Sequence, residues 1–293
     1  MSMTHPIHEG LPRLAVTGIT GLAGQALLQE LERRRDARVY AVELDEVEEH
    51  YLDEGHVAAL VLPEEMDWDA CSALLVASPE LPAWASGLPC PVIRLWPQTG
   101  LATALCQALQ PLVAALPEVS AAQLTVLWPI AVKQQPGIEE LVQQTASLLN
   151  GRGATPRLFG QQVAFNLTLG KLDLAPELAS QLRQLFVPAS CTVVEALAPS
   201  FFAVAVAFHF TLPVTADEAR WRKALTAAGV SVASGRKDLL SLVSDVSGQG
   251  GWQAAGITGD GQQLSGWLCG DLARTLLVEP ALRQWRQLLA VQP

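Results

Sequence analysis

The segment that follows residue 13 has the residue types of a nucleotide-binding turn. A short apolar run at 14–16 leads into Gly18-Ile19-Thr20-Gly21-Leu22-Ala23-Gly24, and an amphipathic stretch follows at 25–35. We expect Gly18 to permit a tight turn, Gly21 to let the backbone approach a pyrophosphate, and Gly24 to allow close helix packing. An ordinary turn between a strand and a helix is the alternative interpretation. The candidate cofactor-binding residues of this segment are Gly18, Thr20, Gly21 and Gly24.

An acidic residue stands where folds of this kind bind a ribose. The predicted strand 38–42 ends in Glu43, which lies 19 positions beyond Gly24. A carboxylate there can accept hydrogen bonds from a ribose 2′-hydroxyl and would repel a 2′-phosphate, which favours NAD over NADP if a dinucleotide binds. Solvated charge in the acidic loop 43–54 explains the residue equally well, so the choice between NAD and NADP stays open.

The sequence lacks the residue patterns of metal sites, serine hydrolases and phosphate-binding loops. The five cysteines and five histidines are scattered without the spacing of metal ligands, so we expect no metal. The sequence has neither the Gly-x-Ser-x-Gly elbow of serine hydrolases nor a Gly-Lys-Ser/Thr phosphate loop. We expect buried, reduced thiols at all five cysteines, which are Cys71, Cys90, Cys106, Cys191 and Cys269.

The amino-acid composition argues against two classes of binding partner, nucleic acids and membranes. The 293 residues carry a net charge of −10 and only 16% are charged, so binding to nucleic acid or to an anionic membrane surface is not expected. The run Arg33-Arg34-Arg35 is interpreted as the solvated last turn of a helix. No apolar stretch approaches the roughly 18 residues of a membrane span and the first six residues lack an apolar signal core, which predicts a cytoplasmic protein.

The elements that must position the glycine turn alternate between strand and helix. Further strands are predicted at 72–77 and 91–95, and this alternation is typical of an α/β fold with a parallel sheet. The pattern changes near Trp96-Pro97-Gln98-Thr99-Gly100, where a long helix at 100–116 begins a second region. Within it, helices are predicted at 137–149, 176–186 and 215–228, strands at 124–128, 191–197, 202–212, 252–257 and 264–269, and a last helix at 272–289. The strand 202–212 is apolar enough to be covered on both faces, and His209 on it is interpreted as a core or interface residue.

The order of these segments resembles the aspartate-semialdehyde dehydrogenase family over nearly the whole chain. The most specific matches are Gly137-Ile138-Glu139-Glu140-Leu141-Val142-Gln143-Gln144-Thr145 and Val163-Ala164-Phe165-Asn166-Leu167. The resemblance implies a Rossmann-like NAD(P)-binding domain at 1–99 plus about 270–293, whose C-terminal helix returns to it. It also implies an α+β dimerisation domain with a mixed sheet at 100–269, and a homodimer formed through that sheet.

The positions that would carry this family's chemistry hold other residues. By the resemblance, the nucleophilic cysteine falls on Thr99, or on Gly100 if the alignment shifts by one place. The orienting glutamine falls on Pro129 and the histidine acid/base near Ser200. A threonine hydroxyl is far less ionised than a thiol, proline has no side-chain donor, and serine does not titrate near neutrality. The family's anion-binding section is shortened too, and Arg94 and Arg183 are the arginines left to hold an anion.

The chain therefore resembles the shortened USG-type homologues that lack the catalytic residues. The first hypothesis is a catalytically inactive paralogue with an interaction or regulatory role, NAD or NADP as a possible ligand and an unidentified protein partner. The alternative is an active NAD(P)-dependent oxidoreductase of the semialdehyde type, in amino-acid biosynthesis, that acts on a different or related substrate by a hydride transfer without a thiolate. The sequence leaves open whether the protein is an enzyme.

Overall fold

The computed structural model describes residues 10–43, 59–98, 100–115, 119–170, 177–186, 190–234 and 238–291. Their contacts group into two compact units. The first comprises the chain up to Gln98 together with the segment from Pro280, and the second comprises Thr99–Glu279. That these units act as a dinucleotide-binding and a dimerisation domain stays a prediction.

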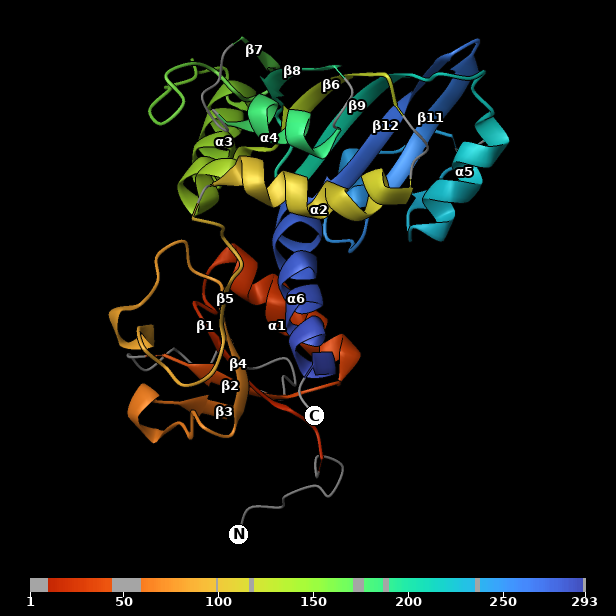
Figure 1. Cartoon of the computed structure of the whole chain (residues 1–293). Coiled ribbons are helices and arrows are strands. Elements are labelled where there is room, and N and C mark those ends of the chain that lie inside the picture. The colour runs from red at the N-terminus through yellow and green to blue at the C-terminus, as the bar shows by residue number, and fades with distance from the viewer. Residues whose placement is uncertain are drawn as a thin grey trace. The chain divides into compact units, whose positions relative to one another are not determined.

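The first unit is built on a parallel sheet, as its alternating strands and helices predict (Figure 1). Its strand order is β3-β2-β1-β4-β5. The chain thus moves outward on one side of β1 and then crosses to the other side, which makes the β1/β4 boundary the topological switch point where such sheets bind ligands. The bounds are β1 Arg13–Thr17, α1 Leu22–Arg34, β2 Arg38–Val42, β3 Ala59–Val61, β4 Cys71–Val76 and β5 Val92–Arg94.

Two features of this sheet were not predicted. The edge strand β3 is only three residues long, too short for an alternating pattern to be visible in the sequence. A register shift where β1 meets the start of β4 pairs Arg13 with Cys71 but Leu14 with Ala73, so that Ser72 forms a bulge. The thiol of Cys71 then joins the same apolar cluster as the side chains of Leu74 and Val76.

The bulge also receives the C-terminal helix. The α6 helix, Glu279–Val291, places the indole Nε1 of Trp285 3.1 Å from Ser72 Oγ, to which it donates a hydrogen bond. Arg286 on the same helix forms an ion pair with Asp36 at 3.1 Å. Trp285 is fully buried, so the last helix completes the core of the first unit, and the expectation that it returns to that unit is confirmed.

The second unit has a mixed sheet of seven strands in the order β10-β11-β12-β9-β6-β8-β7. Its strands are β6 Ala121–Trp128, β7 Thr168–Leu169, β8 Ser190–Leu197, β9 Ala203–Thr211, β10 Ser231–Val232, β11 Gln253–Asp260 and β12 Gln263–Asp271. Its α-helices are α2 Leu101–Ala115, α3 Gln134–Leu149, α4 Leu178–Leu185 and α5 Glu218–Ala227. The neighbours β6 and β8 run parallel, whereas β9 and β12 run antiparallel to their partners, which confirms the expected mixed sheet.

Three of the predicted elements differ from the expectation in helix type or in length. The segment expected to open the last helix, Leu272–Val278, is π-helical, and the α-helix proper starts only at Glu279. Asp271 caps this segment by accepting hydrogen bonds from the backbone N–H groups of Ala273 and Arg274. The two strands predicted at 252–257 and 264–269 are longer than expected, and as β11 and β12 they form a hairpin with strands of eight and nine residues.

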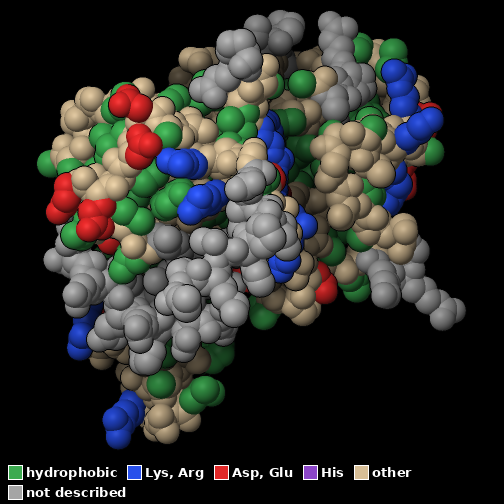
Figure 2. Space-filling model, turned by 90° about the horizontal axis from the view of Figure 1, so that it is seen from below, with side chains coloured by type: hydrophobic (Ala, Val, Ile, Leu, Met, Phe, Trp, Pro, Cys, Tyr) green, Lys and Arg blue, Asp and Glu red, His purple; other side chains and the backbone are tan. Residues whose placement is uncertain are grey.

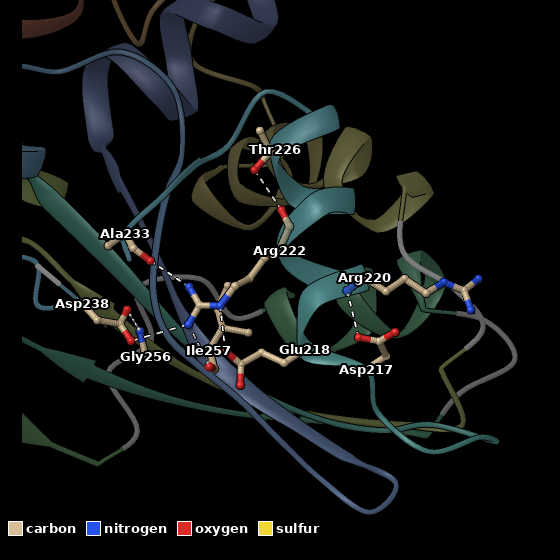
Figure 3. Close-up of polar contacts among 9 residues, drawn as sticks. All are labelled: Asp217, Glu218, Arg220, Arg222, Thr226, Ala233, Asp238, Gly256 and Ile257. Carbon is tan, nitrogen blue, oxygen red and sulfur yellow. Dashed lines mark hydrogen bonds and ion pairs between the residues drawn. The ribbon is translucent and has the colours of Figure 1, made fainter. Parts of the chain in front are cut away.

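A half-buried arginine, Arg222, anchors α5 to the sheet (Figure 3). The guanidinium of Arg222 donates hydrogen bonds to the carbonyl oxygens of Ala233 at 2.8 Å and Ile257 at 3.1 Å. It also pairs with the carboxylates of Glu218 at 2.8 Å and Asp238 at 3.6 Å. Because the donors reach carbonyls that belong to two other segments, this one side chain fixes the position of the helix against the β11 edge.

The run of three arginines is less solvated than expected. The carboxylate of Glu30 accepts hydrogen bonds from Arg33 Nε, at 3.0 Å, and from Arg34 Nε. Only 17% of the Arg34 side chain is exposed, so the expectation of a solvated turn is wrong at this residue and holds for Arg33, which is 70% exposed. Arg35 ends the helix in a left-handed conformation with a φ of 53°.

Candidate functional site

The glycine turn lies where β1 ends, at the switch point of the parallel sheet. Gly18 has a φ of +77°, and a Cβ added to it would lie 2.6 Å from the backbone nitrogen of Ser78 in the loop after β4. A Cβ on Gly24 would lie 2.1 Å from the carbonyl oxygen of Gly18. The tight turn at Gly18 and the close approach of helix α1 at Gly24 therefore both require glycine.

The middle glycine is not required by the fold. A Cβ on Gly21 would meet only the carbonyl oxygen of Gly18, at an ordinary 3.6 Å. Gly21 is the N-cap of α1 and is exposed, as is Thr20 beside it. In folds of this kind a ligand phosphate approaches the helix N-terminus, where these two exposed residues lie.

Glu43 lies against this turn. Its Oε1 accepts hydrogen bonds from the backbone N–H of Gly18 at 2.6 Å and from that of Ile19 at 3.0 Å. The structure thus brings together Glu43 and the glycine string, which sequence reasoning proposed for one site. The contact is to backbone amides of the turn, a partner that the sequence gave no signal for.

The two candidate anion-binding arginines are engaged in contacts with backbone carbonyls. Arg94, at the end of β5, donates from Nη2 to the carbonyl oxygen of Pro79, while its buried Nε has no hydrogen-bond partner within the described residues. Arg183 on α4 donates from Nε to the carbonyl oxygen of Cys191 at 3.2 Å. Arg94 is therefore a structural tie for the loop after β4, and Arg183 is one between α4 and β8.

The second unit brings side by side two of the three positions on which the resemblance places the family's catalytic residues. Pro129 and Ser200 follow the carboxyl ends of the neighbouring parallel strands β6 and β8. The backbone N–H of Ile130 donates to the carbonyl oxygen of Ser200 at 2.8 Å, and that of Ala198 donates to the carbonyl oxygen of Trp128 at 2.9 Å. The third position, Thr99, lies outside the described residues.

The side chains at this strand end have little capacity for proton transfer. Ser200 is only 6% exposed, and its hydroxyl has no hydrogen-bond partner among the described residues. Pro129 offers no side-chain donor. On β8, the carboxylate of Glu195 accepts a 2.5 Å hydrogen bond from the indole of the buried Trp128.

The cysteines do not supply a replacement nucleophile. All five are free thiols, and burial raises the pKa of each. Cys106, on the helix that follows position 99, has a pKa raised by burial to about 12. The pKa values of Cys90 and Cys269 are raised by burial to about 11. Since the thiolate is the nucleophile, these groups are poor nucleophiles near neutral pH.

His209 does not lie at this strand end. Leu127 pairs with Ala205, which puts Pro129 near the start of β9, whereas His209 is six residues beyond Ala203, about 20 Å along the strand. Its Nδ1 lies 2.9 Å from Ser265 Oγ on β12, and the residue is exposed. It is therefore not a core residue, and the interface interpretation of His209 stays a prediction.

Hydrogen bonds join the two segments that carried the most specific resemblance. Glu140 accepts hydrogen bonds from Gln144 Nε2 at 2.8 Å and from the backbone N–H of Arg157 at 3.0 Å. Gln144 Oε1 in turn accepts from the backbone N–H groups of Val163 and Ala164. Both side chains are buried, so these motif residues hold the 157–164 loop against α3 and have a structural role.

The described residues hold neither a metal-ligand cluster nor a membrane-spanning helix. On the face seen in Figure 2, Lys and Arg side chains form several small groups separated by hydrophobic and uncharged atoms. Within the described ranges, no three His, Cys, Asp or Glu side chains are grouped closely enough to hold a metal ion. None of the described helices has the length and apolar character needed to cross a membrane.

The sequence matches no protein-family model. It is 30% identical over 161 residues to the USG-1 protein homolog of Pseudomonas aeruginosa, covering 51% of this chain and 47% of that protein. It is 29% identical over 165 residues to the USG-1 protein homolog of Azotobacter vinelandii, covering 52% of this chain and 49% of that protein. The chain thus spans about half the length of the curated relatives it matches.

Solved structures share the fold over almost the entire chain. A probable aspartate-semialdehyde dehydrogenase from Pseudomonas aeruginosa superposes with a TM-score of 0.75 at 21% identity, over 96% of this chain and 99% of that chain. Aspartate semialdehyde dehydrogenase II from Vibrio cholerae, complexed with ASA, superposes with a TM-score of 0.76 at 19% identity, over 96% of this chain and 98% of that chain. The similarity confirms the expected fold.

Proposed function

We propose that this protein, which is aspartate-semialdehyde dehydrogenase-like in fold and similar to the USG-1 homologues, is a catalytically inactive paralogue that retains a dinucleotide-binding turn and acts through protein contacts. The observation that carries the proposal is the strand end formed by β6 and β8. It brings Pro129 and Ser200 together with neither an amide nor an imidazole side chain at those positions.

The loss of several groups at once favours inactivity over altered chemistry. A thiolate nucleophile and a general acid/base each contribute orders of magnitude in rate, about 10²–10⁴ for the proton transfer alone. Four of the thiols are buried and that of Cys106 is half-buried, burial raises the pKa of all five, and the exposed His209 lies far along β9. None of these groups is placed to take over either role at the β6/β8 strand end.

Retained nucleotide binding is supported by the first unit. The turn residues fit a bound phosphate, because the backbone N–H groups of Gly18 and Ile19 already hold an anionic oxygen, that of Glu43. Gly18, Thr20, Gly21 and Gly24 would form the cradle for NAD or NADP, which when bound would supply hydride chemistry.

Dimer formation is supported by the face of the mixed sheet that presents Trp267, Ala207, Thr125 and Val194 in one row across four strands. Val194 is 61% and Trp267 39% exposed, which is high for apolar side chains in the middle of a sheet. The next row carries Ser265, His209, Gln123 and Thr192. A second copy of the chain would cover the apolar row and provide partners for the polar one.

The test of inactivity is an assay of the semialdehyde dehydrogenase reaction in both directions, with NAD and NADP. We expect no turnover above the uncatalysed rate for the natural chain. The triple variant Thr99→Cys, Pro129→Gln, Ser200→His restores the missing thiol, amide and imidazole, and serves to show whether the scaffold could support the reaction. Turnover by the natural chain at a rate typical of an enzyme, at least about 1 per second, would overturn the proposal.

Thermal-shift titrations with NAD and NADP address the alternative, an active oxidoreductase on another substrate, which the intact glycine turn favours. That alternative needs a bound dinucleotide. A ligand that binds only the folded state must stabilise that state. If millimolar NAD and NADP both leave the melting temperature unchanged, the alternative function is wrong, and so is the proposed nucleotide pocket.

A further inference from the structure

The contact between Glu43 and the glycine turn has a consequence for ligand binding. One carboxylate oxygen accepts both N–H groups, at 2.6 Å from Gly18 and 3.0 Å from Ile19. Hydrogen bonds of an ionised carboxylate to backbone amides are roughly twice as strong as neutral ones. The end of β2 is thereby tied to the turn that follows β1.

Helix α1 leaves its own N-terminus without an anion. Its N-cap is Gly21, which has no side chain to cap the helix, and its first turn contains no acidic residue. The partial positive charge of a helix N-terminus favours a nearby negative group. Glu43 supplies that negative group from a different element of the same unit.

A bound dinucleotide needs the same place. In folds of this kind the pyrophosphate lies against the glycine turn and the helix N-terminus. Each backbone amide has a single hydrogen, so the N–H groups of Gly18 and Ile19 cannot serve both Glu43 and a phosphate oxygen. Even a phosphate bound to the neighbouring amides would face the negative charge of Glu43.

We propose that Glu43 is an internal competitor of the dinucleotide, which occupies the glycine turn in the free protein and must leave it for NAD or NADP to bind. This inference rests on the proposed retention of a nucleotide pocket. It reverses the role expected from the sequence, in which Glu43 helps binding by accepting hydrogen bonds from the ribose. The two roles predict opposite effects when the carboxylate is removed.

The test uses the full chain and four proteins: the natural one, Glu43→Ala, Glu43→Asp and the control Glu64→Ala. Glu64 is an exposed residue of the same unit, so its removal changes the net charge equally without touching the turn. Glu43→Asp keeps the charge but shortens the side chain by one methylene, so that it no longer reaches both amides. Affinities for inorganic pyrophosphate and NAD are measured by calorimetry, and hydrogen exchange of Gly18 and Ile19 by NMR.

Pyrophosphate is the decisive probe because it has no ribose. An apparent dissociation constant rises in inverse proportion to the fraction of protein that is competent to bind. If Glu43 occupies the turn in about nine molecules out of ten, Glu43→Ala should bind pyrophosphate about tenfold more tightly than Glu64→Ala does. Glu43→Asp should also bind more tightly than the natural chain, and the amides of Gly18 and Ile19 should exchange faster in both Glu43 variants.

These measurements distinguish a failure of the competition from a failure of the proposed nucleotide pocket. If the natural chain binds NAD and Glu43→Ala binds pyrophosphate no more tightly than Glu64→Ala does, competition is wrong and the proposed pocket stands. If Glu43→Asp binds pyrophosphate as the natural chain does while Glu43→Ala binds it more tightly, the competition is wrong, and charge repulsion by the carboxylate explains the effect. If none of the four proteins binds NAD or pyrophosphate, the nucleotide pocket itself is wrong, and the competition with it.

Discussion

At the scale of single residues, several side chains that looked like candidates for chemistry hold the fold together. Arg94 ties down the loop after β4, and Glu140 and Gln144 hold the loop that packs on α3. Glu30 belongs to no motif of the sequence, yet it forms ion pairs with both Arg33 and Arg34. Residue types in a motif therefore do not by themselves separate a chemical role from a structural one.

The Glu30 cluster makes stability depend on pH. Hydrogen bonds from Arg33 and Arg34 lower the pKa of Glu30 from its ordinary value of 4.5 to about 2, against the effect of burial. A lowered carboxyl pKa stabilises the folded state above pH 4.5, and this contribution is lost as the pH falls towards 2. We expect Glu30→Gln to lower the free energy of unfolding at pH 7 by about 1–3 kcal/mol, allowing for the exposure of Arg33.

Urea unfolding of Glu30→Gln and the natural chain from pH 7 to pH 3 measures this effect. The difference between the two proteins should shrink as the pH drops below 4.5. The exposed Glu64→Gln serves as the control and should show no such trend. A difference that stays constant down to pH 3 would mean that the ion cluster contributes nothing to stability.

At the scale of elements, α5 depends on one side chain. Arg222→Met keeps most of the side-chain volume but leaves the carbonyls of Ala233 and Ile257 without their donor, along with the carboxylates of Glu218 and Asp238. A buried acceptor that loses its partner costs about 1–3 kcal/mol, and these hydrogen bonds are partly buried, so we expect the lower end of that range. For a unit of this size we expect the melting temperature to fall by several degrees.

Calorimetry on Arg222→Met and Arg220→Met tests this expectation. Arg220 lies on the same helix with an exposed side chain that points away from the sheet, and only its backbone N–H is engaged, with Asp217 (Figure 3). Equal melting temperatures for the two variants would show that the Arg222 network does not anchor α5.

At the scale of the whole molecule, the uncovered sheet row predicts an assembly. We expect light scattering at micromolar concentration to give the mass of a dimer for the natural chain. Val194→Glu places a charge in the middle of the row, where burial against a second copy would be costly, and should give a monomer. Val142→Glu, on α3 and 50% exposed, is the matched control and should remain a dimer. A monomeric natural chain would contradict the proposed interface.

The sequence by itself determined the order of elements and the class of fold. The spacing of Gly18 and Gly24, the alternation of strands and helices, and the apolar strand Ala203–Thr211 are local patterns that only a few backbone arrangements satisfy. They also located the glycine turn, whereas the interest of Pro129 and Ser200 came only from the resemblance to a known family. The short β3 and the bulge at Ser72 escaped prediction because pairing with neighbouring strands, and not their own pattern, defines them.

Only the tertiary structure decided what the candidate residues touch. The bonds from Gly18 and Ile19 to Glu43 join segments more than twenty residues apart, and the pairing of β6 with β8 places Pro129 beside Ser200 across a still longer separation. The high pKa of the Cys106 thiol likewise comes from burial by neighbours that are remote in sequence. Contacts of this kind depend on how the elements pack, and no local pattern of residue types encodes them.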